Sequence, residues 1–143
     1  MTNATMKTFG FPDTLVRPYD HWAVLVRPAQ VTLGSLVLVS TSEATAFGDL
    51  PPGAYPELGR AVPAIEAALR AFVDFEKINY LMLMMVDPHV HLHVLPRYSG
   101  SRVWHGLNLP DGGWPGPPDL KSATAIDPGE QALLRDEIAK HFG

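Results

Sequence analysis

Residues 89–95 read His-Val-His-Leu-His-Val-Leu, and polar and apolar residues alternate strictly from residue 89 to residue 94. Alternation with a period of two is typical of a β-strand that buries one of its faces. The pattern predicts that the aliphatic residues enter the core while His89, His91 and His93 project from the opposite face. A folded strand requires the aliphatic half of this pattern, but it does not require three imidazoles in register. We therefore interpret the histidines as functional residues.

Three other apolar runs predict strands. Trp22–Val26 and Leu36–Val39 are short, and the connection between them contains Gly34. Ile78–Met85 is rich in large apolar residues and predicts a buried strand. Residues 86–88, which include an Asp-Pro pair, predict a compact turn that leads the chain into the histidine strand.

The spacing of apolar residues between Leu58 and Phe72 predicts an amphipathic helix. Apolar side chains recur there every three or four positions, which places them on one face of a helix. They are Leu58, Val62, Ile65, Leu69 and Phe72. Pro63 lies inside this run, and because proline lacks the amide donor we expect a kink or a second helix start there.

A second helix is expected near the end of the chain. Asp127, Pro128 and Glu130 have the spacing of an N-cap, a first helical residue and the partner in a capping box. The apolar face expected for this helix consists of Leu133, Leu134, Ile138 and Phe142. Residues 110–118, rich in glycine and proline, predict an ordered connection before it. The elements together predict an α+β fold with an antiparallel sheet, one long helix across it and a helical C-terminal extension.

Composition narrows the classes of partner and location. A chain of 143 residues is expected to form one domain, and its net charge of −4 argues against binding to duplex nucleic acid. The most apolar stretch, Leu81–Val86, is too short to cross a bilayer, and Met1–Gly10 lacks the apolar run of a secretory peptide. The chain contains no cysteine, so it has no disulfide framework. We expect a cytoplasmic protein that has no membrane partner.

Two kinds of chemistry compete for the three histidines. A metal ion needs ligand nitrogens at about 2.0–2.1 Å from several directions. Alternate residues of a strand lie about 6.6–6.8 Å apart, so two neighbours could share an ion but all three would converge poorly. A row of imidazoles suits an extended anion better. The central imidazole can attack a phosphorus atom while its neighbours donate hydrogen bonds to the oxygens.

The segment Asp87–Arg97 resembles the signature of the histidine triad superfamily of nucleotide hydrolases and transferases. Residues 89–95 fill every position of the family pattern His-φ-His-φ-His-φ-φ, where φ is apolar, and the following Pro-Arg is similar to the fragile-histidine-triad-like branch. The resemblance covers about the first hundred residues. It implies a histidine triad domain at residues 8–106, with residues 107–143 forming the Gly/Pro-rich connection and the C-terminal helix, and it implies a homodimer.

The resemblance also implies roles for individual residues. His91 would be the nucleophile that forms a transient nucleotidyl-histidine at an α-phosphate, with His89 and His93 orienting it and contacting phosphate oxygens. Substrates would be dinucleoside polyphosphates or nucleoside phosphoramidates, and no cofactor or metal would be needed. From their residue types, Arg97 and Arg27 are candidate phosphate-binding cations and Asn79 is a candidate substrate contact.

Some positions depart from the family pattern and keep alternatives open. Ser35 stands where family members often carry a histidine, and residues 84–88 offer few side-chain donors for a phosphate. A nucleotide-binding protein with little catalysis is therefore an alternative, and a histidine-based metal-binding protein is a less favoured one. In the C-terminal segment, Trp104, His105 or Trp114 could shape a pocket across a dimer, or the tryptophans could anchor a loop to the core.

Overall fold

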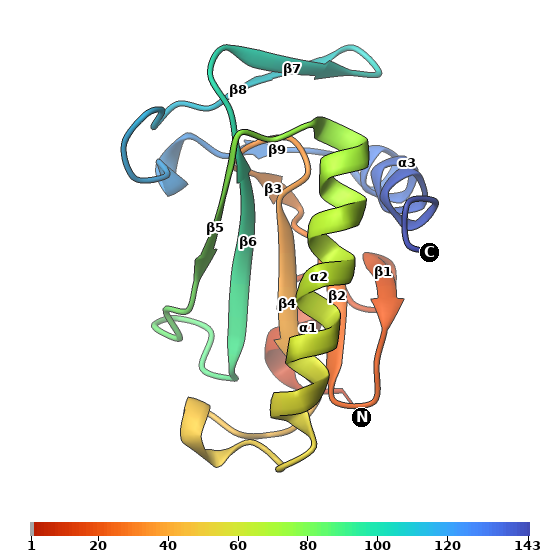
Figure 1. The fold of residues 1–143 in the computed structure, drawn as a ribbon, viewed down its shortest axis with the longest axis vertical. Helices are drawn as coiled ribbons and strands as arrows, with labels where there is room; N and C mark the ends of the chain where they lie inside the picture. The colour runs from red at the N-terminus through yellow and green to blue at the C-terminus, as the bar shows by residue number, and fades with distance from the viewer. Residues whose placement is uncertain (1) are drawn as a thin grey trace.

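The computed structural model describes residues 2–143 and places five strands in one antiparallel sheet, in the order β1-β2-β4-β6-β5 (Figure 1). The strands of this sheet are β1 Leu15–Pro18, β2 Trp22–Val26, β4 Leu36–Ser40, β5 Lys77–Leu81 and β6 His91–Arg97. The helices are α1 Ala4–Thr8, α2 Ala54–Val73 and α3 Pro128–Ala139, with 3₁₀ turns η1 Phe47–Asp49 and η2 Leu120–Ser122. Two small ladders pair β3 Ala29–Gln30 with β9 Thr124–Ala125, and β7 Ser101–Trp104 with β8 Leu107–Pro110. The expected α+β class and antiparallel sheet are confirmed.

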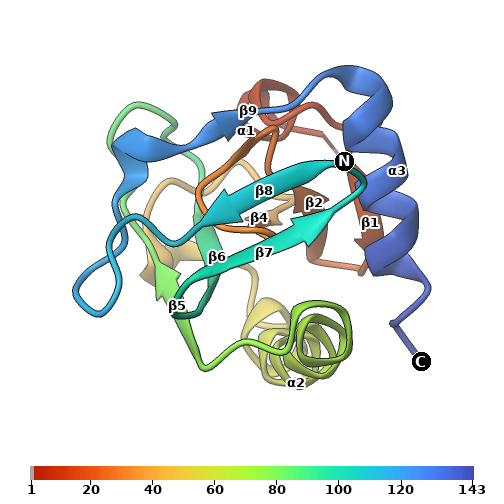
Figure 2. The same cartoon turned by 90° about the horizontal axis from the view of Figure 1, so that it is seen from above.

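Each face of the sheet packs against a different helix. The long helix α2 crosses one face, and α1 with the segment that follows it covers the other (Figure 2). The larger core lies under α2, where Ile65 and Leu69 pack against alternate residues of β2, β4 and β6. The smaller core lies under α1, where Met6 packs against the other set of alternate residues on β2 and β4. Because successive side chains of a strand point to opposite faces, alternate residues of β2 and β4 enter two separate cores.

The register of β6 places the histidines on the face that α1 covers. His91 pairs with Val39, and His93 pairs with Val37. Paired residues in neighbouring strands project to the same face, and both valines belong to the smaller core under α1. Because β6 lies between β4 and β5, its backbone is held on both sides.

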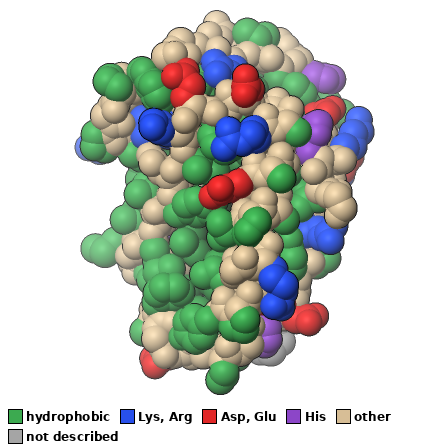
Figure 3. Space-filling model, in the orientation of Figure 1, with side chains coloured by type: hydrophobic (Ala, Val, Ile, Leu, Met, Phe, Trp, Pro, Cys, Tyr) green, Lys and Arg blue, Asp and Glu red, His purple; other side chains and the backbone are tan. Residues whose placement is uncertain are grey.

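The expected strand Ile78–Met85 is wrong in length and in burial. The strand β5 ends at Leu81, and its residues 78–81 are only half-buried because β5 is an edge strand with β6 as its one neighbour. The chain then continues as a loop to His91, in which Met85 is 83% exposed and Val86 is 91% exposed. Hydrophobic side chains gather on the lower left of Figure 3, over the position of this loop. Apolar composition alone therefore did not indicate burial here.

Two details of the helices also differ from expectation. The helix α2 runs without interruption through Pro63, which is exposed, so the carbonyl group that its ring leaves unbonded lies on the solvent side. In α3 the capping box of Asp127 and Glu130 is formed, but Leu133 is 53% exposed and only part of the expected apolar face packs on the core. Within residues 2–143, no helix combines the length and the apolar character needed to cross a membrane.

A buried ion pair attaches the C-terminal connection to the end of β6. Arg97 donates from Nε to Asp111 Oδ2 at 2.6 Å and from Nη2 to Asp111 Oδ1 at 3.0 Å. Two further donations, to Asn79 Oδ1 and to the carbonyl of Gly116, use most of its remaining N–H groups. The two charged side chains are only 4% and 1% exposed. Each charged group compensates the other inside the fold, so removal of one side chain would leave the charge of the other buried without a partner.

Removing the carboxylate of this pair should strongly destabilise the fold. We expect Asp111→Ala to lower the free energy of unfolding by about 3–5 kcal/mol, because it leaves the Arg97 guanidinium buried without a counter-charge. Urea titration followed by circular dichroism measures this change. The matched control is Asp136→Ala, which removes an exposed carboxylate paired with Arg135 and should change stability little. Equal effects of the two substitutions would contradict this account.

Candidate active site

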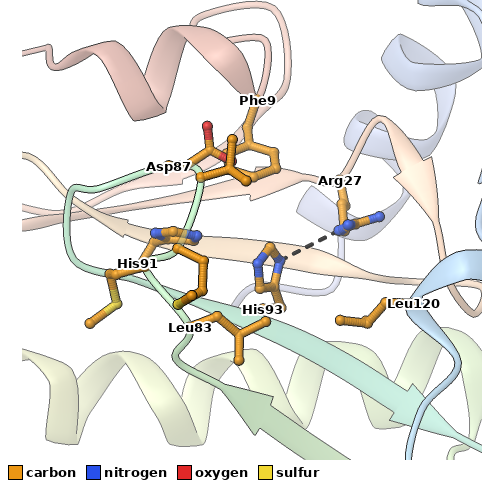
Figure 4. A pocket seen from close by; sticks show the side chains of 10 residues that line it. Phe9, Arg27, Leu83, Asp87, His91, His93 and Leu120 are labelled. Atoms are coloured by element: carbon orange, nitrogen blue, oxygen red, sulfur yellow. Dashed lines mark hydrogen bonds between the residues drawn. The ribbon is translucent and has the colours of Figure 1, made fainter.

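A cavity of about 230 Å³ opens beside the first residues of β6 on the α1 face of the sheet (Figure 4). His91 and His93 form its floor, Phe9 and Arg27 lie on one side, and Leu120 and residues 83–87 complete the lining. These residues come from five separate parts of the chain. The cavity therefore exists only in the folded protein, and it brings two of the three predicted histidines together with the predicted Arg27.

The hydrogen bond made by His91 fixes which of its ring nitrogens is reactive. Its Nδ1 lies 2.6 Å from the carbonyl oxygen of His89, and a carbonyl oxygen can only accept. Nδ1 therefore carries a proton, and in the neutral ring Nε2 keeps its lone pair. Among residues 2–143 no partner bonds to this Nε2, and no buried side-chain nitrogen or oxygen lacks a partner. The lone pair of Nε2 is thus open to the cavity.

His93 has the opposite tautomer. Arg27 donates from Nε to His93 Nδ1 at 3.5 Å, so the proton of the neutral ring lies on Nε2 (Figure 4). Burial lowers the pKa of His93 to about 4, and the positive charges of Arg27 and of a protonated His91 act in the same direction. The ring is therefore neutral near pH 7. Beside His91, whose ring centre is 5.0 Å away, it offers an N–H donor instead of a lone pair.

His89 lies just before β6 and does not line the cavity. The hydroxyl of Thr5 accepts from the His89 backbone amide at 3.3 Å and donates to Nδ1 at 2.9 Å. This arrangement leaves the proton on Nε2, which lies 3.1 Å from Glu43 Oε1. All hydrogen-bonding atoms of the ring are engaged. The imidazole of His89 thus holds in place the backbone carbonyl that bonds to His91.

Thr5, Phe9 and Glu43 are site residues that sequence reasoning missed. The Phe9 ring lies 5.6 Å from the ring of His91 and 5.7 Å from that of His93. No periodicity or motif in the first nine residues indicates such contacts. The contacts of Thr5 and Phe9 arise because α1 packs across the sheet, and that of Glu43 arises because the loop after β4 lies beside His89.

The cavity contains two formal charges of opposite sign. Burial lowers the pKa of the Arg27 guanidinium from its ordinary value, and the nearby negative charge of Asp87 acts in the opposite direction. Arg27 also donates from Nη1 to the carbonyl of Ala29, which fixes its orientation. An anionic ligand would meet the remaining face of Arg27 and the N–H of His93, with Asp87 nearby, beside Phe9 (Figure 4).

The two other predicted contacts, Arg97 and Asn79, do not lie at this cavity. They are at the far end of the β5–β6 pair, where Lys77 pairs with Arg97 and Asn79 pairs with Leu95. Asp111 takes the guanidinium of Arg97, as described above, so the expected phosphate-binding role is not supported by its position. Both residues instead line a second cavity of about 380 Å³ beside Trp114.

The described residues offer no ready cation site. Within residues 2–143, no group of three histidine or carboxylate side chains is placed to hold a metal ion. Four of the six ring nitrogens already bond to a carbonyl, a hydroxyl, a carboxylate and a guanidinium.

Comparison with solved structures identifies the fold. A histidine triad protein of Sinorhizobium meliloti superposes with a TM-score of 0.76 at 19% identity, covering 99% of this chain and 96% of that one. A histidine triad protein of Bradyrhizobium japonicum gives 0.71 at 19% identity, covering 100% and 98% of the two chains. A hypothetical histidine triad nucleotide-binding protein of Sulfolobus tokodaii gives 0.68 at 16% identity, covering 90% and 83%.

No family model and no curated protein matches the sequence. At these identities the solved structures bear on the fold alone. The chain therefore has the fold of the histidine triad proteins, and the resemblance indicated by residues 89–95 is confirmed at that level.

The depressed pKa of His93 predicts a pH dependence of stability. An unfolded histidine binds its proton near pH 6.5, whereas folded His93 binds it only near pH 4. Between these values the unfolded state holds more protons, so stability falls as the pH falls. Relative to His93→Gln, the wild type should lose on the order of 2 kcal/mol of unfolding free energy between pH 7 and pH 4.

Urea titrations at several pH values measure this difference. His105→Gln, which removes an exposed histidine, is the matched control and should keep the wild-type slope. A slope that is unchanged in His93→Gln would show that folding does not lower the pKa of His93.

Proposed function

We propose that this chain, which has the histidine triad fold, is a nucleotide hydrolase or nucleotidyl transferase that acts at an α-phosphate through His91. One observation carries the proposal. The His89 carbonyl holds the proton of His91 on Nδ1, and the unprotonated Nε2 opens to the cavity. A neutral imidazole with a fixed tautomer and an accessible lone pair is the arrangement that nucleophilic catalysis requires.

In the first step, His91 Nε2 gives its electron pair to the phosphorus, and the bond from phosphorus to the leaving group breaks. The leaving group takes the bonding pair and, where it is an amine, also takes a proton from solvent. The nucleotidyl group is left bonded to His91 Nε2. The imidazole ring becomes positively charged, and the His89 carbonyl stabilises it by accepting the Nδ1 proton in a 2.6 Å hydrogen bond. In the second step, water or another acceptor forms a P–O bond, and the bond from phosphorus to His91 Nε2 breaks. The electron pair of that bond returns to Nε2, and the proton of the acceptor passes to solvent.

The flanking groups have different roles in this proposal. The Nε2–H of His93 and the free N–H groups of Arg27 donate to the phosphoryl oxygens, on which negative charge increases in the transition state. His89 acts as a positioning residue, because Thr5 and Glu43 hold its ring outside the cavity. Arg27 thus takes the phosphate-binding role, and Arg97 and Asn79 lie beside residues 114–117, which form the Trp114 loop.

A nucleotide-binding protein with little catalysis is the second candidate. It is favoured by the composition of residues 83–86, which line the cavity with leucine, two methionines and valine and contribute no side-chain hydrogen-bond donor. Such a protein would bind a nucleotide at Arg27 and His93 without forming the covalent intermediate. The hypothetical nucleotide-binding protein of Sulfolobus tokodaii has a similar fold. That similarity supports nucleotide binding, which both candidate functions require.

Nucleophilic catalysis can be tested by trapping the intermediate. We incubate the purified protein, after chelation of metals, with dinucleoside polyphosphates and adenosine phosphoramidates, quench rapidly and search for an AMP adduct by mass spectrometry. The wild type should carry AMP on His91. His91→Ala should lose the adduct and lower turnover by roughly 10³-fold or more, because the whole nucleophilic route is removed.

His105→Ala is the control, since His105 is exposed in the turn between β7 and β8. Nucleotide binding without adduct or turnover would support the second candidate. Turnover that disappears on chelation and returns with zinc would contradict the metal-free route.

We further propose that the protein is a homodimer in which β5 pairs with β5 of a second copy. Among the residues that the structure describes, β5 is an edge of the sheet and only β6 lies beside it. Its residues are mostly half-buried. The backbone N–H and C=O groups on the outer side of an edge strand can pair with a strand of another copy. Antiparallel pairing would bring the Trp114 loop, at the Lys77 end of one copy, towards residues 81–83 of the other.

A charge placed on this edge should weaken the dimer. We expect sedimentation equilibrium to show a wild-type dimer and a dissociation constant raised at least about tenfold in Ile78→Lys, because lysine on an edge strand opposes pairing. Val103→Lys, on the exposed strand β7, is the matched control and should leave the dimer unchanged. A wild-type protein that stays monomeric at all concentrations would refute the proposed pairing.

A further inference from the structure

The loop between β5 and β6 carries most of the methionines of the chain. Of the five methionines, Met82, Met84 and Met85 lie in this loop. Met85 is 83% exposed, Met84 is half-buried, and both line the cavity that contains His91 (Figure 4). Met6, by contrast, is only 1% exposed in the core under α1. The chain contains no cysteine, so methionine supplies all of its sulfur.

The loop is held in place by packing. Within residues 2–143, no backbone hydrogen bond of a turn or loop involves residues 83–88. Met82 packs against the larger core. Met84 has a φ of 45°, a left-handed backbone conformation that is uncommon for a residue with a side chain. Apolar contacts of the methionines therefore hold the conformation of this loop, in place of backbone hydrogen bonds.

Oxidation turns the apolar sulfur of an exposed methionine into a polar sulfoxide. A peroxide is the oxidant. The sulfur donates an electron pair to one peroxide oxygen, an S–O bond forms and the O–O bond breaks. The other oxygen leaves as hydroxide and takes the proton of the transferred oxygen, which gives water when the oxidant is hydrogen peroxide. The sulfur is oxidised by two electrons, and the peroxide is reduced by the same two electrons.

A sulfoxide at this position would change the hydrogen bonding of the cavity. The side chains of residues 83–86 that line it are apolar. The donors in the cavity are the Nε2–H of His93 and the free N–H groups of Arg27. A sulfoxide oxygen accepts hydrogen bonds, so it would compete with an anion for these donors. It would also lose its hydration when a ligand covers the loop, which costs free energy.

We propose that Met85, with Met84 beside it, is a site of reversible oxidation by peroxides, and that the sulfoxide weakens nucleotide binding in the adjacent cavity. A thiol-dependent methionine sulfoxide reductase would restore the thioether. The inference goes beyond the proposed function and takes from it only that the cavity binds a nucleotide. Oxidising conditions would thus lower the activity of the protein, and reduction would return it.

Peptide mapping tests where oxidation occurs. The full chain is treated with graded hydrogen peroxide, quenched with catalase and digested, and mass spectrometry measures the sulfoxide fraction at each methionine. Met85 should oxidise at least about tenfold faster than Met6, because reactivity follows exposure. Met82 and Met84, which are half-buried, should fall between them. Equal rates at Met85 and Met6 would overturn the proposed site.

Calorimetric titration with AMP tests the effect of oxidation on binding. The dissociation constant for AMP should rise roughly tenfold when Met84 and Met85 are fully oxidised. Treatment with the two stereospecific methionine sulfoxide reductases and dithiothreitol should return it to the starting value. Circular dichroism of the oxidised protein should show an intact fold. An unchanged dissociation constant at full oxidation of both residues would overturn the proposal.

Leucine variants assign the effect to the loop. The double variant Met84→Leu, Met85→Leu keeps apolar side chains of similar volume that peroxide does not oxidise. Each protein is compared with its own untreated form, so differences in starting affinity cancel. The double variant should keep its affinity for AMP after peroxide, whereas the control Met6→Leu should lose affinity as the wild type does. Equal losses in the double variant and the wild type would contradict the assignment.

The same proteins distinguish failure of this inference from failure of the proposed function. An untreated protein that binds AMP but forms no adduct on His91 refutes nucleophilic catalysis, and the effect of oxidation on binding is still measured. Adduct formation together with an affinity that peroxide leaves unchanged overturns the oxidation site alone. If the untreated protein does not bind AMP, both proposals are overturned.

Discussion

The register of β6 against β4 decides on which face of the sheet the histidines lie. A shift of one residue would turn every side chain of β6 to the opposite face. Val90 and Val94 would then leave the core under α2, and His91 would enter it without a partner. Both valines are fully buried, and each contributes roughly 1.5–3 kcal/mol through burial. The burial of the aliphatic side chains therefore fixes the face of the sheet on which His91 and His93 lie.

Three identical side chains acquire three different properties from their surroundings. A carbonyl oxygen fixes the proton of His91 on one nitrogen, a guanidinium fixes that of His93 on the other, and a hydroxyl with a carboxylate engages the ring of His89. The partners come from α1, from the segment after β2 and from the loop after β4. The motif supplies three imidazoles, and their hydrogen-bond partners determine the tautomer and the position of each ring.

The sequence predicts well those features that depend on local pattern. The limits of β2 follow from five consecutive apolar residues, and the start of α3 follows from the capping box at Asp127. Features that depend on distant contacts are not predictable in this way. The role of Arg97 is decided by Asp111, which lies beyond a hairpin, and the exposure of Met85 follows from the position of β5 at the sheet edge. Residue type alone suggested a phosphate ligand and a buried strand.

The small helix α1 has a consequence for how the protein inactivates. Thr5 ties this five-residue helix to His89, and the His89 carbonyl holds the proton of His91. Short helices open locally at a smaller free energy than the whole fold. Detachment of α1 would release the carbonyl of His89 and let the proton of His91 move between its two nitrogens. The reactive tautomer should therefore be lost at a lower temperature than the sheet that carries it.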